Sequence, residues 1–283
     1  MLSYISRDGI IKEDMRKDFQ TGSGYAHATS VRRDALLSEK GMKGIVPPPP
    51  TTERGRELKL WGLAALYVLV ASVLCIVCYP VTISDTMARY APMADAFARG
   101  DWHYAFHPRF GVLFQVVAGA VAWLTGLSGA QAVQVASILF VALAAVPLWY
   151  LVRDIFGEKA AWGAVALLLV SDDFTRYAMD GLRDTGKCLA FALLGLGAVR
   201  RSGLWFGLGL FVLIALVSYG FAVASVLVFG WCVWALWTRR FGALPLPVLA
   251  WALGTLAVSF MVHAYTSHWL PAPHYIDVLG RWL

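Results

Sequence analysis

Residues 131–152 read QAVQVASILFVALAAVPLWYLV, a mainly apolar run with no charged side chain. A helix needs roughly 20 such residues to cross the hydrocarbon core of a bilayer. Within the bilayer a helix satisfies its backbone hydrogen bonds inside the segment itself. The run therefore predicts a membrane-spanning helix, and it sets the fold class as all-α.

Similar apolar blocks occur on both sides of this run. The full set is about 58–80, 110–127, 131–152, 159–171, 187–200, 203–217, 219–237 and 244–264. Several blocks are shorter than a full crossing and are separated by only a few residues. The pattern predicts a polytopic bundle of seven or eight transmembrane helices.

The composition agrees with a membrane protein. Of the 283 residues, 59% are hydrophobic and 15% are charged, whereas soluble domains carry about 25% charged residues. The net charge of +6 is scattered between apolar blocks, which argues against a nucleic-acid partner. The four cysteines lie inside apolar stretches, so we interpret them as small core side chains. Membrane lipid is the first expected partner.

The chain divides into a polar N-terminal extension, 1–57, and a transmembrane domain, 58–283. The extension ends in Pro47–Pro50 and lacks a sustained apolar period. Basic residues at helix ends mark the cytoplasmic side. Arg54, Arg56 and Lys59 therefore predict a cytoplasmic N-terminus, and the pairs Arg200–Arg201 and Arg239–Arg240 fit the same side.

The order of the blocks raises a topological conflict. Three apolar blocks separate the polar segment 81–109 from the polar segment 172–187. If all three crossed the membrane, the two segments would face opposite sides, yet Arg200–Arg201 places the second segment outside. One block must therefore be something other than a simple crossing.

The first polar segment carries Asp85 at the end of the first membrane block. Met87, Tyr90 or Ala91, Ala94 and Phe97 follow at helical spacing, which predicts a short amphipathic helix at the membrane surface. Asp85 stands where it could cap that helix or act as a general base. The residues alone leave both roles open.

Two further groups of polar residues carry candidate chemistry. His103 and His107 are either metal ligands or interfacial anchors, and Pro108 argues against a regular helix around them. In the second segment, Arg176, Arg183 and Lys187 could converge on an anion, since Arg binds phosphate bidentately. The alternative is that they pair with the acidic residues around them, which include Asp184.

These features resemble the N-terminal half of the polytopic glycosyltransferases that use lipid-phosphate sugars, which include the protein O-mannosyltransferases and the bacterial lipid A aminoarabinose transferases. The resemblance covers roughly residues 60–235. It rests on Asp85, Tyr90, Ala94–Ala98, Gly100-Asp101-Trp102, His107-Pro108, the Arg153-Asp154-Ile155-Phe156-Gly157 turn and Leu182-Arg183-Asp184. A single Asp85 followed by Thr86 stands where many members have Asp-Glu.

The resemblance implies an inverting transfer of a sugar from a polyprenyl-phosphate donor to a hydroxyl on the outer face of the membrane. Asp85 and Asp184 would be catalytic, and Tyr90, His103 and His107 would contact substrate. The donor phosphate would be bound by Arg109, Arg176, Arg183 and Lys187. Some relatives use a divalent metal and others do not, so the resemblance implies no certain cofactor. The expected location is a bacterial inner membrane with a periplasmic active site.

Members of this family are usually longer than this chain. The resemblance therefore leaves three interpretations of its length: a truncated product, a compact relative, or one subunit of a pair. A different class of function also stays open, namely a non-catalytic subunit that binds a second membrane protein, or a transporter. A transporter is expected to show internal repeats, and the sequence shows no convincing repeat.

Overall fold

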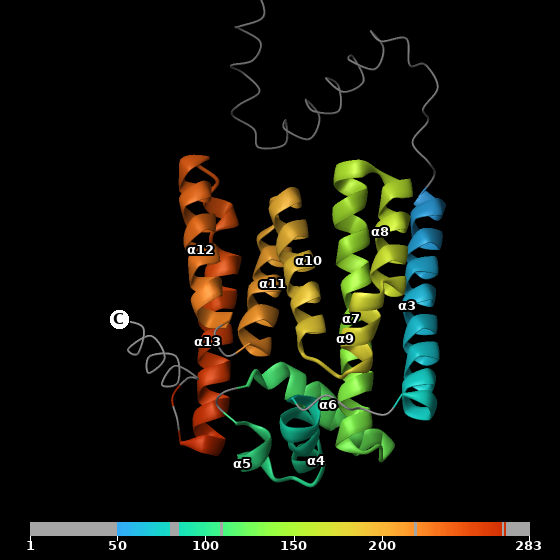
Figure 1. Ribbon diagram of the computed structural model, residues 1–283. Helices are drawn as coiled ribbons and strands as arrows, with labels where there is room; N and C mark the ends of the chain where they lie inside the picture. Colours follow the sequence, from blue (N-terminus) through green and yellow to red (C-terminus); the bar gives the residue numbers. More distant parts are fainter. Residues whose placement is uncertain (1–49, 80–84, 108–109, 218–219, 268, 270–283) are drawn as a thin grey trace, which may run out of the picture. The chain divides into compact units, whose positions relative to one another are not determined.

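The computed structural model describes residues 50–79, 85–107, 110–217, 220–267 and 269. All regular elements within these residues are helices (Figure 1). The contacts divide the chain into two units, Met1–Gly55 and Arg56–Leu283, and the helical bundle belongs to the second. The all-α membrane bundle is confirmed. The polar extension up to residue 49 and Arg109 lie outside the described residues.

Four of the described helices are long and apolar enough to cross a membrane. They are α3 (Pro50–Cys78), α7 (Gly129–Phe156), α12 (Gly220–Trp237) and α13 (Pro245–Thr266). The shorter α8 (Glu158–Val170), α10 (Asp184–Arg200) and α11 (Gly203–Leu216) run alongside them in Figure 1. The apolar blocks of the sequence therefore correspond to these helices, and the chain is an integral membrane protein.

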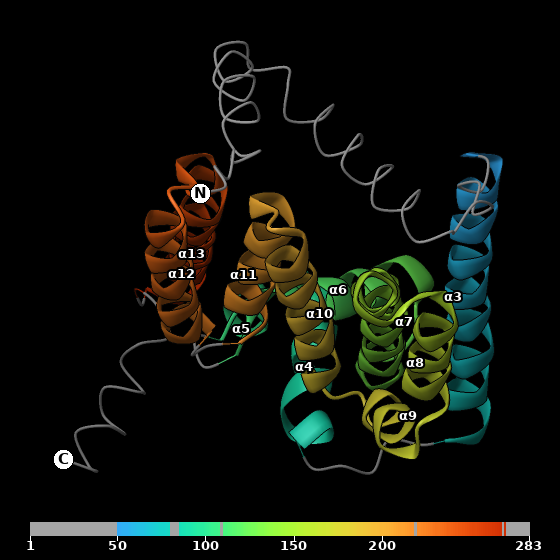
Figure 2. The same ribbon diagram turned by 90° about the horizontal axis from the view of Figure 1, so that it is seen from above.

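The helix α6 (Val112–Thr125) accounts for the remaining apolar block and resolves the topological conflict. It lies across the ends of the long helices instead of beside them (Figures 1 and 2). The chain therefore enters and leaves α6 at one end of the bundle. The segments 85–107 and 171–187 consequently meet at that end, which we call the loop end.

The loop end is built from short helices. The first segment forms the π-helix η2 (Thr86–Tyr90), then α4 (Ala91–Ala98) and the single turn α5 (Trp102–Ala105). The second segment forms α9 (Asp172–Met179). The expected helix is present as η2 and α4 in succession. Of its predicted apolar stripe, Tyr90, Ala91 and Ala94 are buried and Phe97 is partly buried, whereas Met87 is exposed. No regular helix was expected around His103, but the single turn α5 includes this residue. The Asp101 carboxylate caps the turn by accepting from the Tyr104 N–H at 3.2 Å.

The long helix α7 separates two apolar cores. One core joins α7 to α3 and α8 through Ile138, Val141 and Trp149. The other joins α7 to α4, α6 and the later helices through Val133 and Phe140. Because α7 faces both cores, it fixes the position of the loop end relative to the rest of the bundle.

The α7 termini show why this helix begins and ends where it does. Ser128 and Gln131 form a reciprocal capping box at its start. Gly157 follows its last residue with φ of 90°, a conformation that favours glycine and allows the chain to reverse into α8. The predicted boundaries of this block, 131–152, were short by two residues at the first end and four at the second.

Charge differs between the two ends of the bundle. The end opposite the loop end, which we call the basic end, carries Arg56, Lys59, Arg153, Lys159, Arg200, Arg201, Arg239 and Arg240. The loop end carries Asp85, Asp95, Asp101, Asp172, Asp173, Asp180 and Asp184 beside its own cations. The predicted catalytic carboxylates, Asp85 and Asp184, therefore lie at the loop end.

Candidate functional site

Direct hydrogen bonds join the two polar segments. The hydroxyl of Thr86 donates to the backbone carbonyl of Asp180 at 2.6 Å, and Thr86 is fully buried. The Gln134 amide of α7 donates to the carbonyl of Met179 at 2.7 Å and to that of Tyr79 at 3.0 Å. The two polar segments, which are far apart in the sequence, are thus hydrogen-bonded to each other and to α7.

Asp180 lies at the centre of this junction and was not assigned a role from the sequence. Its side chain is buried, with the whole residue 3% exposed. One carboxylate oxygen accepts from the Tyr79 hydroxyl at 3.3 Å, and the other lies 3.8 Å from Arg176 Nε. The Asp180 charge, ahead of burial, raises the pKa of Tyr79 above its ordinary value. We interpret Asp180 as an organiser of the loop end.

Removing the Thr86 hydroxyl tests this junction. Thr86→Val keeps the shape of the side chain but leaves the buried Asp180 carbonyl without its donor, which costs about 1–3 kcal/mol. We expect a lower thermal unfolding midpoint in detergent. Thr125→Val is the matched control, because the Thr125 hydroxyl donates to Val121 O on an exposed helical surface. Equal midpoints for the two variants would contradict the role of the junction.

Arg183 faces two aromatic rings from the first segment. Its guanidinium carbon lies 5.8 Å from the Tyr90 ring centroid and 5.6 Å from that of Phe110. Arg89 approaches the same Phe110 ring at 5.9 Å. The Arg183 Nη1 atom is buried, and no described residue accepts a hydrogen bond from it. A partly buried cation with an unused, buried donor is the kind of group that binds an anion.

Both predicted catalytic carboxylates affect the pKa of one phenol, the Tyr90 side chain. Burial is the main cause that raises the pKa of the Tyr90 hydroxyl. The Arg183 charge opposes the increase, whereas the charges of Asp184 and Asp85 add to it. Tyr90 thus lies within the electrostatic reach of both loops. Geometry links the same groups: Arg183 and Arg89 both face the Phe110 ring, and Arg89 pairs with Asp85. Asp85, Tyr90, Arg183 and its chain neighbour Asp184 therefore belong to one site, which we call the two-loop site.

Each carboxylate of the two-loop site has a basic neighbour one helical turn away. Asp85 Oδ1 lies 2.8 Å from Arg89 Nη1, and both side chains are partly exposed. Asp85 makes no side-chain cap to the helix that follows it, so the structure does not support the capping alternative. Asp184 pairs with Lys187 across one turn of α10. Self-pairing is therefore present, but it leaves Arg183 outside these pairs.

A cavity of about 340 Å³ adjoins the Asp85–Arg89 pair. Its lining is Ala88, Arg89, Met93, Tyr104, His107 and Phe110. Arg89, which lines the cavity, also pairs with Asp85. Phe110, which lines it too, also faces the Arg183 guanidinium. Of the predicted substrate-binding residues, Tyr90 belongs to the two-loop site and His107 to this adjoining cavity.

The remaining predicted site residues lie elsewhere. His103 Nδ1 contacts the backbone carbonyl of Tyr265, which ties α5 to the end of α13. Arg176 pairs with Asp180, and its side chain is 71% exposed. The structure therefore groups Arg183 and Lys187 near the carboxylates, but it gives Arg176 and His103 different contacts.

The described residues contain no group of three or more His, Cys, Asp or Glu side chains that could hold a metal ion. The two histidines of the predicted pair have separate contacts, His103 with Tyr265 and His107 with the Phe110 ring at 5.5 Å between centroids. Each histidine of the pair thus has a contact of its own within the described residues, and the choice between anchor and metal ligand stays a prediction.

No family model, curated protein or solved structure matches this chain. The resemblance to lipid-phosphate-sugar glycosyltransferases therefore rests on the sequence motifs alone.

Proposed function

We propose that this protein is an integral-membrane glycosyltransferase that transfers a sugar from a polyprenyl-phosphate donor to a hydroxyl acceptor. The observation that carries the proposal is the buried, unpartnered Nη1 of Arg183, held over Tyr90 and Phe110. Two carboxylates lie close by: Asp85 pairs with Arg89, which faces the same Phe110 ring, and Asp184 follows Arg183 in the chain. An anion-binding cation beside candidate bases is the combination that this reaction needs.

The donor phosphate is the anion that fits Arg183. A phosphate that becomes the leaving group gains negative charge in the transition state, and a fixed cation in a site of low dielectric stabilises it strongly. Arg183 supplies a planar guanidinium already oriented by two rings. Lys187, one turn into α10, adds a second positive charge beside Asp184.

Asp85 is the proposed general base. It takes the proton from the acceptor hydroxyl while the hydroxyl oxygen bonds to the anomeric carbon of the donor sugar. The bond from that carbon to the phosphate oxygen breaks, and the electron pair leaves with the polyprenyl phosphate. This single displacement inverts the anomeric centre. Asp184 positions Lys187 and does not itself contact the transferred sugar.

The cavity beside Asp85 is the proposed place for a sugar ring. Its volume of about 340 Å³ lies in the range of small-molecule sites. Phe110 and Tyr104 offer apolar faces, and Arg89 and His107 offer polar groups. A sugar also has apolar ring faces and polar hydroxyls, so the lining matches its chemistry.

The proposed orientation follows from the charge of the two ends. Basic residues gather at the end opposite the two-loop site, and such residues mark the cytoplasmic side. The N-terminus is therefore proposed to be cytoplasmic and the two-loop site periplasmic, in a bacterial inner membrane. Polyprenyl-phosphate sugars displayed on that face are the matching donor class.

The experiment measures transfer from labelled polyprenyl-phosphate sugars in proteoliposomes that contain the purified full chain. Arg183→Gln is expected to lower the transfer rate about 100-fold, because a lost transition-state donor costs roughly 10²–10³ in rate. Arg99→Gln is the matched control and is expected to keep most of the activity, since Arg99 is an exposed cation of the loop end outside the two-loop site.

The result that overturns the proposal is equal activity of the wild type and Arg183→Gln. Absence of transfer by the wild type with every donor tested, together with stable co-purification of a second membrane protein, would favour a non-catalytic subunit instead. Folding of each variant is checked by its thermal unfolding midpoint in detergent.

A further inference from the structure

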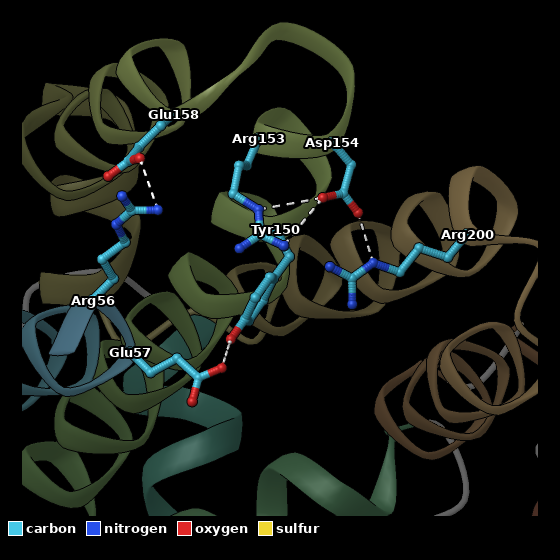
Figure 3. Close-up of polar contacts among 7 residues, drawn as sticks. All are labelled: Arg56, Glu57, Tyr150, Arg153, Asp154, Glu158 and Arg200. Atoms are coloured by element: carbon cyan, nitrogen blue, oxygen red, sulfur yellow. Dashed lines mark hydrogen bonds and ion pairs between the residues drawn. The ribbon is translucent and has the colours of Figure 1, made fainter. Parts of the chain in front are cut away.

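A second polar network lies at the basic end, away from the two-loop site (Figure 3). It joins four helices through side chains of Arg56, Glu57, Tyr150, Arg153, Asp154, Glu158 and Arg200. The proposed transfer reaction uses none of these residues. Their arrangement therefore calls for a separate explanation.

The core of this network is one carboxylate between two guanidinium groups. Asp154 Oδ2 accepts from Arg200 Nε at 2.6 Å, across the gap between α7 and α10. Asp154 Oδ1 accepts from Arg153 Nε at 3.3 Å and from its Nη2 at 3.4 Å. Both oxygens of Asp154 are engaged, yet the three side chains together keep one positive charge.

The ring of Tyr150 brings the two cations closer together. The guanidinium carbons of Arg153 and Arg200 each lie 4.9 Å from its centroid. Arg153 also lies 4.8 Å from the Trp149 ring. Aromatic faces attract cations, so Tyr150 and Asp154 hold two like charges in one place. An anion that contacts both would relieve their repulsion.

The guanidinium groups retain donors for such an anion. Within the described residues, nothing accepts from the two terminal nitrogens of Arg200 or from Nη1 of Arg153. Figure 3 shows these terminal nitrogens beside Tyr150, between α7 and α10. The side chains of Arg153 and Arg200 are 26% and 29% exposed, so a ligand can reach them from outside.

The other acidic residues of the network have their own partners. Glu158 lies 3.1 Å from Arg56. Glu57 accepts from the Tyr150 hydroxyl at 2.6 Å, at the far end of the ring from Asp154 in Figure 3. Together these seven residues carry three positive and three negative side chains. Arg201, which follows Arg200 in the chain, brings the region to an excess of one positive charge.

The depth of the network in the membrane indicates which anions are present. The helix α7 has 28 residues and is therefore about 42 Å long. The hydrocarbon core is about 30 Å thick, and the headgroup layers extend it to about 40–45 Å. Arg153, in the last turn of α7, therefore lies at the level of lipid phosphates.

We propose that Arg153 and Arg200 form a binding site for a phosphate group, with an anionic phospholipid headgroup of the surrounding membrane as its main source. Basic pockets between transmembrane helices bind such headgroups. Arg200 would bind phosphate oxygens through its two terminal nitrogens, and Arg153 through Nη1. Because the site lies between α7 and α10, a bound lipid would hold these helices together at the basic end.

The experiment is native mass spectrometry of the full chain in neutral detergent. Three probes are added separately: phosphatidylglycerol, phosphatidylcholine and inorganic phosphate. The wild type is expected to retain phosphatidylglycerol at least about ten times more tightly than Arg153→Gln/Arg200→Gln, because two charge-assisted contacts are lost. Lys159→Gln is the matched control: it removes the same kind of charge at the same end, and it is expected to bind as the wild type does.

The probes distinguish the sources of phosphate. Preference for phosphatidylglycerol over phosphatidylcholine, with little displacement by inorganic phosphate, supports the headgroup. Displacement by millimolar inorganic phosphate supports the same site with a free anion as its ligand. If the double variant does not fold, Arg200→Lys replaces it, since it keeps the charge but loses the planar fork. Equal lipid retention by the wild type, the altered site and Lys159→Gln overturns the proposal.

Discussion

Asp85→Asn is expected to reduce sugar transfer about 1,000-fold while leaving the protein folded. A positioned general base contributes roughly 10²–10⁴ in rate, and the asparagine amide cannot take up the acceptor proton. Asp85 is partly exposed and makes no cap to the following helix. Its replacement by an isosteric amide should therefore affect chemistry far more than stability.

The expected loss lies in kcat and not in donor binding. The proposal assigns the donor phosphate to Arg183 and the acceptor proton to Asp85, so the two substitutions should separate. Asp85→Asn keeps the cation that holds the donor, whereas Arg183→Gln removes it. Binding of labelled donor without acceptor, measured beside the transfer rate, distinguishes these roles.

Asp173→Asn is the matched control for Asp85→Asn. Asp173 is an exposed carboxylate in the first turn of α9 at the same end of the bundle. Its neutralisation changes the charge of the loop end equally but removes no proposed base. We expect Asp173→Asn to keep transfer within about threefold of the wild type. Unchanged transfer by Asp85→Asn would remove Asp85 from the reaction and leave Arg183 as a binding residue only.

The sequence predicted the helices well because membrane residence makes each apolar run a helix. The block 131–152 became the centre of α7, and 203–217 became α11 with nearly the same boundaries. The block 110–127 also became a helix, but its direction was not predictable from hydropathy. A buried helix that lies across the bundle and a spanning helix can have the same composition.

The two-loop site was only partly predictable for a related reason. Asp85, Tyr90, Arg183 and Asp184 could be identified as sparse polar residues between apolar blocks. The buried junction at Asp180 depends on contacts across the fold, from Thr86 and Tyr79. One signal could have pointed to it: Gln134 is a polar residue inside an apolar block, and such residues usually have a buried partner.

Gly129→Ala is expected to lower the free energy of unfolding by about 3 kcal/mol or more. A Cβ at this position would lie 2.1 Å from the Ala91 carbonyl oxygen and 2.8 Å from the Asp95 carboxylate. The backbone of α4 cannot move away as a flexible side chain could, and overpacking of this kind typically costs 1–3 kcal/mol and occasionally more. The Gly129 N–H also donates to Asp95 Oδ1 at 2.6 Å, a bond that the displacement would stretch.

Gly163→Ala is the matched control, because a Cβ there meets no atom within 4 Å. Alanine also favours a helix more than glycine, so this variant is expected to change stability by less than about 1 kcal/mol. Thermal unfolding in detergent measures both. Gly129 lies where α4 meets the start of α7, and η2 with Asp85 and Tyr90 leads directly into α4. Any folded Gly129→Ala protein should therefore also show reduced transfer, whereas wild-type stability in this variant would mean that α4 is not pressed against α7.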